Sequence, residues 1–434
     1  MISVQNHQQR LSGNKILTGL GIILALGACS PKTTGVLQSP GHQGGMVSGQ
    51  PVKKEDNKST SAHKVELTKE EREAKFIAEK RSKNNSITLV LPFQLDKVNP
   101  AALSKADVTR SSIALDFYQG FQMGLDEVAK QGKSFVLDVV DSRDDELHNS
   151  RIANSLDVRG ASLIVGPVYP KEIRSFGEGL VDKSVLQINP LAASRATDYN
   201  LSNLVSLTPS ITMHTRAMAS QMARDAGSGD VLIIYSTGDA DGKQFLTGFA
   251  GEIRKVKPSA QIKTVSSLAQ LNEAMTTTGS NLIAVGTTEK TELRSFLSNL
   301  DKKVKEGYYT FKLYGHPLWD RIDFSGFENF ENYSPIISAE AHIKSWSSAV
   351  KDFREKYTAS FGVAPSDHAF KGYDVARYFG NLMAKYGADY ANHVTKESYD
   401  GIYSSYNFEK NNTAGYLNNA VSYKVYRGNT FQLN

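Results

Sequence analysis

Short apolar runs alternate with helical patterns along the chain after residue 86. The first run, Ile87-Thr-Leu-Val-Leu-Pro92, shows no alternation of polar and apolar residues, which is typical of a strand buried on both faces. Leu115–Lys130 then has apolar side chains at helical spacing, with Gly120 and Gly124 on an adjoining stripe. Buried strands that alternate with helices predict a parallel sheet covered by helices on both faces.

The alternation restarts after residue 206 and so predicts two similar sets of elements. The other predicted strands are Phe135–Val140, Leu163–Pro167, Val185–Ile188, Val231–Tyr235, Leu282–Gly286, Phe311–Gly315, Tyr406–Phe408, Ser422–Tyr426 and Thr430–Gln432. The other predicted helices are Asp141–Arg159, Pro170–Lys183, Met213–Ala226, Gly242–Lys255, Glu289–Leu300, Ser345–Phe361 and Ala369–Lys385. This length exceeds what one hydrophobic core usually spans. We therefore expect an α/β fold with two doubly wound parallel-sheet lobes and several crossovers.

The chain opens with a basic segment and the short apolar stretch Ile16–Leu26. That order is typical of a secretory signal, and the stretch is too short for a membrane-spanning helix, which needs roughly 20 residues. Leu26-Gly-Ala-Cys29 resembles the lipobox of bacterial lipoproteins, which implies a signal peptide over 1–28 and lipid attachment (palmitate and related acyl chains) at Cys29. The alternative is an ordinary buried thiol. Cys29 is the only cysteine, so the protein has no internal disulfide to form.

The residue after the cysteine, Ser30, bears on localisation. By resemblance to the proteobacterial sorting rule, an aspartate there would mean retention in the inner membrane. Ser30 thus favours an outer membrane, and the lack of an acidic cluster after Cys29 favours a domain that faces the periplasm. We expect a lipid-anchored protein of the cell envelope.

Residues 29–85 form a predicted tether. The part from Ser30 to about Lys64 is rich in Ser, Thr, Gly, Gln, Lys and Pro, and such a composition buries too little apolar surface to offset its ordering entropy. Thr68 then caps a charged segment that ends near Lys83, which we interpret as a short solvated helix with a docking helix as the alternative.

The net charge of +5 comes from the amino-terminal part of the chain. The leader contributes +2 and residues 30–85 contribute +4, so the remainder carries −1. A near-neutral domain lacks the basic surface that nucleic-acid binding needs. We expect no nucleic-acid partner.

Six passages after residue 86 share their order and spacing with one known family. They are Ile87–Phe93, Asp116–Asp126, Ile164–Tyr169, Asn189–Ser194, Gly372–Asp374 and Gly415–Asn418. The chain resembles the type I periplasmic-binding proteins of the branched-chain amino acid receptor kind. The resemblance implies one lobe over 86–206 and 342–398, and a second over 207–341 and 399–434. The same lobes also occur in outer-membrane lipoproteins that activate peptidoglycan synthases, so the fold leaves the function open.

The carboxyl ends of the predicted strands give the candidate ligand residues, because ligands of open parallel sheets bind there. In the amino acid receptors, two loops of the first lobe hold the ligand carboxylate. The matching positions here are Tyr169, Ala193 and Ser194. The alternatives are that Pro167 and Pro190 only turn the chain, and that Ser194 only caps a helix.

The second lobe departs from the family pattern. Its receptors hold the ligand ammonium with a tyrosine and an acid, and neither stands in place after the two matching strands. Glu289, His316 and Trp319 are the candidates there, with a helix cap as the alternative for Glu289 and hinge packing for Trp319. Ordinary α-amino acid binding is thereby placed in doubt.

The sequence contains no nucleophile elbow, no zinc-protease motif and no phosphate-binding glycine loop, and its nine histidines are scattered. We read the aspartates at 138–145 as helix caps, and Asp239 and Asp241 as turn residues. We therefore expect no enzyme, no metal and no cofactor.

The leading hypothesis is a lipid-anchored periplasmic solute-binding protein that closes on a small polar ligand, such as an amino acid or peptide, for uptake through an ABC-type permease. The alternative is an outer-membrane interaction module that regulates cell-wall synthesis through a peptidoglycan synthase and has a degenerate ligand cleft.

Overall fold

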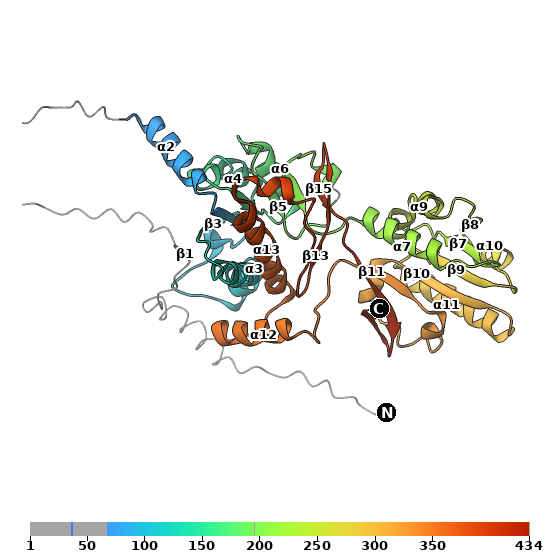
Figure 1. Cartoon of the computed structure of the whole chain (residues 1–434). Helices are drawn as coiled ribbons and strands as arrows, with labels where there is room; N and C mark the ends of the chain where they lie inside the picture. Colours follow the sequence, from blue (N-terminus) through green and yellow to red (C-terminus); the bar gives the residue numbers. More distant parts are fainter. Residues whose placement is uncertain (1–35, 38–66, 195, 434) are drawn as a thin grey trace, which may run out of the picture. The chain divides into compact units, whose positions relative to one another are not determined.

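The computed structural model describes residues 36–37, 67–194 and 196–433. The predicted signal peptide, Cys29 and most of the predicted tether lie outside these residues. Two large, mostly parallel sheets flanked by helices carry the fold (Figure 1). The predicted α/β fold class is confirmed.

One sheet has eight strands in the order β1–β3–β2–β4–β5–β6–β15–β14. They are β1 Val36–Leu37, β2 Ser86–Leu91, β3 Phe135–Asp141, β4 Leu163–Val165, β5 Gln187–Asn189, β6 Leu204–Ser206, β14 Phe408–Asn411 and β15 Gly415–Asn418. β2 and β3 are parallel, with Ile87 opposite Leu137, and β14 and β15 form an antiparallel hairpin. All six residues of β2 are buried, as its unbroken apolar run predicted.

The other sheet has seven strands in the order β17–β16–β11–β10–β9–β7–β8. They are β7 Val231–Tyr235, β8 Ile262–Val265, β9 Ser280–Val285, β10 Thr310–Gly315, β11 Ile336–Ala339, β16 Ser422–Arg427 and β17 Thr430–Leu433. β7 to β11 are parallel, whereas β16 and β17 run antiparallel to their neighbours. A separate ribbon pairs β12 Tyr399–Asp400 with β13 Ser405–Tyr406.

The helices lie before, between and after the strands along the chain. They are α2 Lys69–Ser82, α3 Lys105–Ala129, α4 Glu146–Ile152, α5 Leu156–Arg159, α6 Pro170–Gly179, α7 Ile211–Asp225, α8 Ala240–Leu246, α9 Phe249–Val256, α10 Leu268–Ala274, α11 Lys290–Lys305, α12 Ser348–Phe361 and α13 Asp367–Tyr386.

Two of the single helices predicted from the sequence are each two helices. The predicted helix over 141–159 is α4 and α5, because Asp145 and Ser155 each cap a separate start. The predicted helix over 242–255 is α8 and α9, because Gly248 between them has φ +80°. Left-handed backbone at a glycine ends one helix and redirects the chain into the next.

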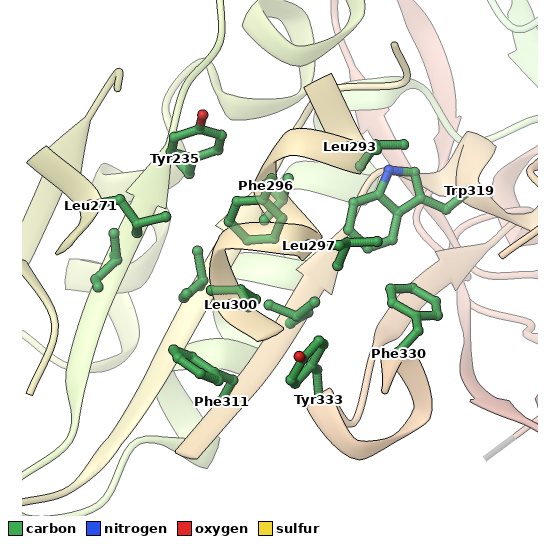
Figure 2. Packing of buried hydrophobic residues seen from close by; sticks show 14 of the residues in the cluster. Tyr235, Leu271, Leu293, Phe296, Leu297, Leu300, Phe311, Trp319, Phe330 and Tyr333 are labelled. Carbon is green, nitrogen blue, oxygen red and sulfur yellow. The ribbon is translucent and has the colours of Figure 1, made fainter. Parts of the chain in front are cut away.

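Both faces of the seven-stranded sheet are buried. Alternate residues of its central strands point to opposite faces, so that Ile233 and Ile283 lie on the α11 side and Ile234 and Leu282 on the other. Figure 2 shows the first of these faces, where four side chains of α11 pack against the strands: Leu293, Phe296, Leu297 and Leu300. Met218, Met222, Phe245, Phe249 and Ile253 of α7 to α9 cover the second face.

α3 and α13 pack so closely that two positions of their contact have room only for glycine. A Cβ on Gly120 would lie 1.9 Å from the carbonyl oxygen of Ala369, and one on Gly372 would lie 2.2 Å from that of Phe117. The stripe of Gly120 and Gly124 predicted on α3 is therefore the surface that packs against α13.

α2 is docked at its carboxyl-terminal end, which the prediction of a solvated helix did not include. Thr68 and Glu71 form a capping box at its start. Near its end, the Lys80 ammonium lies 2.6 Å from the Asp138 carboxylate, and Arg81 donates to the carbonyl of Arg159 at 2.8 Å. These two contacts tie α2 to β3 and to the end of α5.

Packing divides the described chain into two compact units. The first comprises the described residues up to Arg143 together with Ser155–Ile164 and Lys344–Tyr390, and the second comprises Asp144–Asn154, Val165–Ile343 and the described residues from Ala391. The whole seven-stranded sheet belongs to the second unit. The lobe limits given above stay a prediction.

Candidate functional site

The loop after β4 turns at Gly166, which has φ +109° and precedes a cis peptide bond to Pro167. The N–H of Gly166 donates to the carbonyl of Ile188 at 2.8 Å, which ties this loop to β5. Tyr169 occupies the position before α6, and its side chain makes no cap hydrogen bond. Burial raises the pKa of the Tyr169 hydroxyl, and the charges of Asp144 and Glu172 raise it further.

The first turn of α6 holds a carboxylate of its own. Glu172 is 1% exposed, and its Oε1 accepts from the Asn149 side chain at 2.9 Å. A negative charge is favourable at the positive end of a helix. Glu172 therefore partly neutralises the start of α6, next to the Tyr169 position that the resemblance assigns to a ligand carboxylate.

The loop after β5 is held by one buried side chain. The Asn189 amide accepts from the N–H of Ala192 and donates to the carbonyl of the same residue, both at 2.9 Å. Ala193 is then exposed and Ser194 is half-buried. Ser194 lies beside the Tyr199 phenol, whose pKa is raised mainly by burial and lowered by the Ser194 hydroxyl.

The loop after β9 contains Glu289 at the position before α11. Its side chain is exposed and makes no cap hydrogen bond, whereas its N–H donates to the Thr287 hydroxyl at 3.1 Å. The Glu289 carboxylate therefore makes no capping hydrogen bond to α11, which was the alternative role that we gave for this residue.

His316 follows β10 and begins the short 3-10 helix Pro317–Arg321. Its Nδ1 accepts from the N–H of Leu318 at 3.0 Å, and its ring lies edge-on to Phe245 with 5.2 Å between centroids. The ring is 4% exposed. Burial lowers the pKa of His316 to about 4, although the charges of Asp241 and Asp239 raise it. The imidazole is therefore neutral near pH 7.

Trp319 is a core residue. It is fully buried and packs with Phe324 and Phe330; Figure 2 shows its ring in the core beside Leu297 and Phe330. Its indole N–H donates to the carbonyl of Thr287 at 2.8 Å. A ligand has no access to this ring, so we leave Trp319 out of the candidate site. Its hydrogen bond to Thr287 ties the β9 and β10 loops together.

The same sheet edge carries groups that the sequence did not single out as ligand residues. The interpretation of two turn residues was wrong: Asp239 caps α8 through the N–H of Gly242 at 2.7 Å, and Asp241 lies in α8 itself. The Asp241 carboxylate accepts from the Thr288 hydroxyl, in the loop after the neighbouring strand β9, at 2.8 Å. His214 in α7 is buried, and its Nδ1 lies 2.8 Å from the Ser338 hydroxyl. Burial lowers the pKa of His214 to about 4.

Sequence comparison finds neither a family model nor a curated protein that matches the chain. Solved structures do match. A putative branched-chain amino acid ABC transporter from Rhodospirillum rubrum has a TM-score of 0.56 and 14% identity, over 81% of this chain and 99% of that chain. An ABC transporter substrate-binding protein from Desulfitobacterium hafniense has a TM-score of 0.51 and 16% identity, with the same coverage. The fold is that of the type I periplasmic-binding proteins.

In a type I fold the carboxyl ends of the parallel strands are where ligands bind. Tyr169, Ala193 and Ser194 follow β4 and β5 of the eight-stranded sheet, while Glu289 and His316 follow β9 and β10 of the seven-stranded sheet. The structure therefore puts these five residues at strand ends, as the sequence predicted.

Among the residues that the structure describes, no group of three or more His, Cys, Asp or Glu side chains has an arrangement that would hold a metal ion. None of the described helices combines the length and hydropathy of a membrane span.

Proposed function

We propose that this protein is a solute-binding protein that captures a small polar molecule and delivers it to an ABC-type permease. The observation that carries the proposal is the type I fold with polar groups gathered at the carboxyl ends of its strands. The pinned Asn189–Ser194 loop supplies backbone groups and a hydroxyl, and the edge with His316 supplies an imidazole and carboxylates. Small-molecule sites are built in this way, from a few placed polar groups in a formed scaffold.

The direct test is a thermal-shift screen of the full chain against amino acids, amides, short peptides, aromatic acids, sugars and muropeptides. A ligand at 100 times its dissociation constant stabilises a protein by about 2.7 kcal/mol, which is a shift of a few degrees. We expect one chemical class to give a reproducible shift. A flat response to the whole panel would contradict solute binding and favour the cell-wall interaction module.

Ser194 provides the site-specific control. Its half-buried side chain follows the pinned loop, so a bulky Ser194→Trp substitution should abolish the ligand-induced shift. Ser202→Trp, at an exposed position before β6, is the matched change away from the loop and should leave the shift in place. An unchanged affinity in Ser194→Trp would remove the β5 loop from the site.

We further propose that Cys29 carries the lipid anchor and that the protein lies on the periplasmic side of the outer membrane. The support is the sequence around the cysteine and Ser30. Two or more acyl chains hold a protein on a membrane stably. Labelling cells with a palmitate analogue should mark the wild type and not Cys29→Ser, and density separation of the two membranes should place the labelled protein in the outer one.

A further inference from the structure

α2 is a helix without a buried face. None of its residues is buried, although helices in folded proteins are stabilised mainly by packing an apolar stripe. Its own sequence supplies its local order, through the capping box of Thr68 and Glu71, acidic residues in the first turn and basic residues in the last. The apolar burial that usually fixes a helix in place is therefore small in α2.

Three side chains on one face of α2 hold it against the first compact unit: Glu73, Lys80 and Arg81. Glu73 lies 3.9 Å from the Arg159 guanidinium, and both side chains are largely in water, where an ion pair contributes little. Arg81 donates to the carbonyl of Arg159 at 2.8 Å. Lys80 makes the ion pair that is shielded from water.

The Lys80 ammonium lies 2.6 Å from the Asp138 carboxylate of β3 and 3.7 Å from the Asp157 carboxylate of α5. The side chains of Lys80 and Asp138 are 12% and 9% exposed, so salt screens their attraction less than that of a surface pair. A Cβ at Gly160 would lie 2.7 Å from Cδ of Lys80, so the aliphatic part of the lysine rests on this glycine. One side chain thus carries most of the docking of α2.

The short connection between α2 and β2 provides a pivot. Asn84 has left-handed backbone with φ +44°, and Asn85 donates its side-chain N–H to the carbonyl of Ser134 at 2.9 Å, so the first unit holds the chain from residue 85 onward. The preceding part of the predicted tether joins the other end of α2, about 21 Å away for a helix of 14 residues. A pull on the tether therefore acts on the far end of a lever, whereas Lys80 holds α2 close to the pivot.

We propose that α2 is a releasable arm between the predicted tether and the first compact unit, and that the ion pair of Lys80 with Asp138 is its latch. Docked, the arm fixes the place at which the tether leaves the unit. Released, it swings about residues 83–85 and moves that place by up to about twice the helix length, roughly 40 Å. Release returns the charges of Lys80, Asp138 and Asp157 to water, so none is left shielded and unpaired.

This inference goes beyond solute binding and does not depend on it. The arm gains its role, control of the reach from a membrane, from the proposed lipid anchor at Cys29. Labelling with the palmitate analogue tests that anchor separately, and the following experiment tests the arm without any lipid.

The test measures distances by electron paramagnetic resonance in the full chain with Cys29→Ser, where two introduced cysteines carry the spin labels. Glu70→Cys labels the exposed first turn of α2, and Gln131→Cys labels the exposed turn after α3. The docked arm should give one short-distance population. Raising the salt concentration from about 0.1 M to about 1 M shortens the Debye length from about 10 Å to about 3 Å, so a population at longer distance should grow.

Two variants open the latch from opposite sides. Lys80→Glu places a carboxylate against Asp138 and Asp157, so the released fraction should rise at least roughly tenfold. Gly160→Ala adds a Cβ that displaces the Lys80 side chain, and should shift the distances in the same direction. Lys69→Glu, the same charge reversal in the exposed first turn, is the matched control and should leave the distances unchanged.

Thermal melting separates release from unfolding. Because α2 buries no residue, Lys80→Glu should melt within about 4 °C of the wild type. A larger fall in both Lys80→Glu and Gly160→Ala would make α2 an inseparable part of the first unit and overturn the inference. An unchanged distance distribution in the two variants would also overturn it, because contacts other than the latch would then hold the helix.

Discussion

The two sheets offer a ligand different chemistry at their carboxyl edges. After β5 of the eight-stranded sheet, the loop is shaped by one amide side chain, Asn189, and presents backbone groups, Ala193 and the Ser194 hydroxyl. After β7, β9 and β10 of the seven-stranded sheet, the loops present two carboxylates and a neutral imidazole. The first edge therefore carries polar groups without charge, whereas the second carries negative charge.

The two edges are also held in shape by different means. The β5 loop depends on hydrogen bonds between residues three positions apart. The seven-stranded edge depends on contacts between loops, such as the indole of Trp319 on the carbonyl of Thr287. Local contacts and contacts between distant segments should respond differently to substitution, and the following predictions use that difference.

The largest effect is expected from Trp319→Ala. The ring is fully buried among aromatic side chains and also holds the β9 loop, so its removal should lower the free energy of unfolding by about 3–5 kcal/mol. The only other tryptophan, Trp346, is 66% exposed, and Trp346→Ala should have a much smaller effect. Denaturant unfolding measures both. Equal losses would contradict the core role of Trp319.

The next effect concerns pH. His214 and His316 each have a pKa of about 4 in the folded protein, mainly through burial, whereas the ordinary value is 6.5. Between those two values the unfolded chain binds protons that the folded protein does not, so stability falls as the pH is lowered from about 6.5 to about 4. The free energy of unfolding falls by about 1.4 kcal/mol per pH unit for each histidine within this range. Above pH 6.5 these two groups cause no further change of stability with pH.

Variants isolate this contribution from that of the carboxylates. Denaturant unfolding at several pH values should show a shallower slope in His214→Asn and in His316→Asn than in the wild type. The charges around the two rings are those of Glu340, Asp239 and Asp241, and they remain in both variants. A slope that does not change would mean that neither ring is buried in its neutral form.

A smaller effect is expected at the β5 loop. Asn189→Ala removes both hydrogen bonds to Ala192 in a buried setting, and should lower stability by about 1–3 kcal/mol. Asn412→Ala in the exposed turn between β14 and β15 is the matched control. Urea unfolding compares the two. Because the contact is local, ligand contacts at the seven-stranded edge should survive the change.

The smallest effect separates two acids of the seven-stranded edge. Glu289 is exposed and its side chain caps nothing, so Glu289→Gln should change stability by no more than about 0.5 kcal/mol. Asp241→Ala should cost more, because the Asp241 carboxylate accepts from the Thr288 hydroxyl. Denaturant unfolding of the two variants side by side measures the difference, and a larger loss in Glu289→Gln would contradict it.

Periodicity was enough to predict most of the central strands and long helices, because burial on both faces leaves an unbroken apolar run, as in β2. It missed β8, an edge strand with Lys263 and Thr264 exposed. It also missed β6 and β11, which are buried but only three and four residues long. It also merged α8 with α9, since the apolar spacing continues across Gly248 and only the backbone angle of that glycine separates the helices.

The candidate site could be predicted only in part. The sequence shows which residues follow a predicted strand, and for that reason Ser194 and His316 were candidates. Whether such a residue faces solvent depends on distant partners, and Trp319 is buried because Phe324 and Phe330 cover it. Asp241 was interpreted as a turn residue because its hydrogen-bond partner, the Thr288 hydroxyl, lies far along the chain.

The cap at His316 has an evolutionary consequence. The backbone there requires a side chain that accepts from the N–H of Leu318, and asparagine, which a single-base change reaches from histidine, is among the preferred residues for that role. The local fold and the chemistry of the side chain are thereby separable at one position. A lineage that exchanges His316 for asparagine keeps the start of the 3-10 helix and loses the imidazole, so this strand end changes its chemistry without passing through an unstable ancestor.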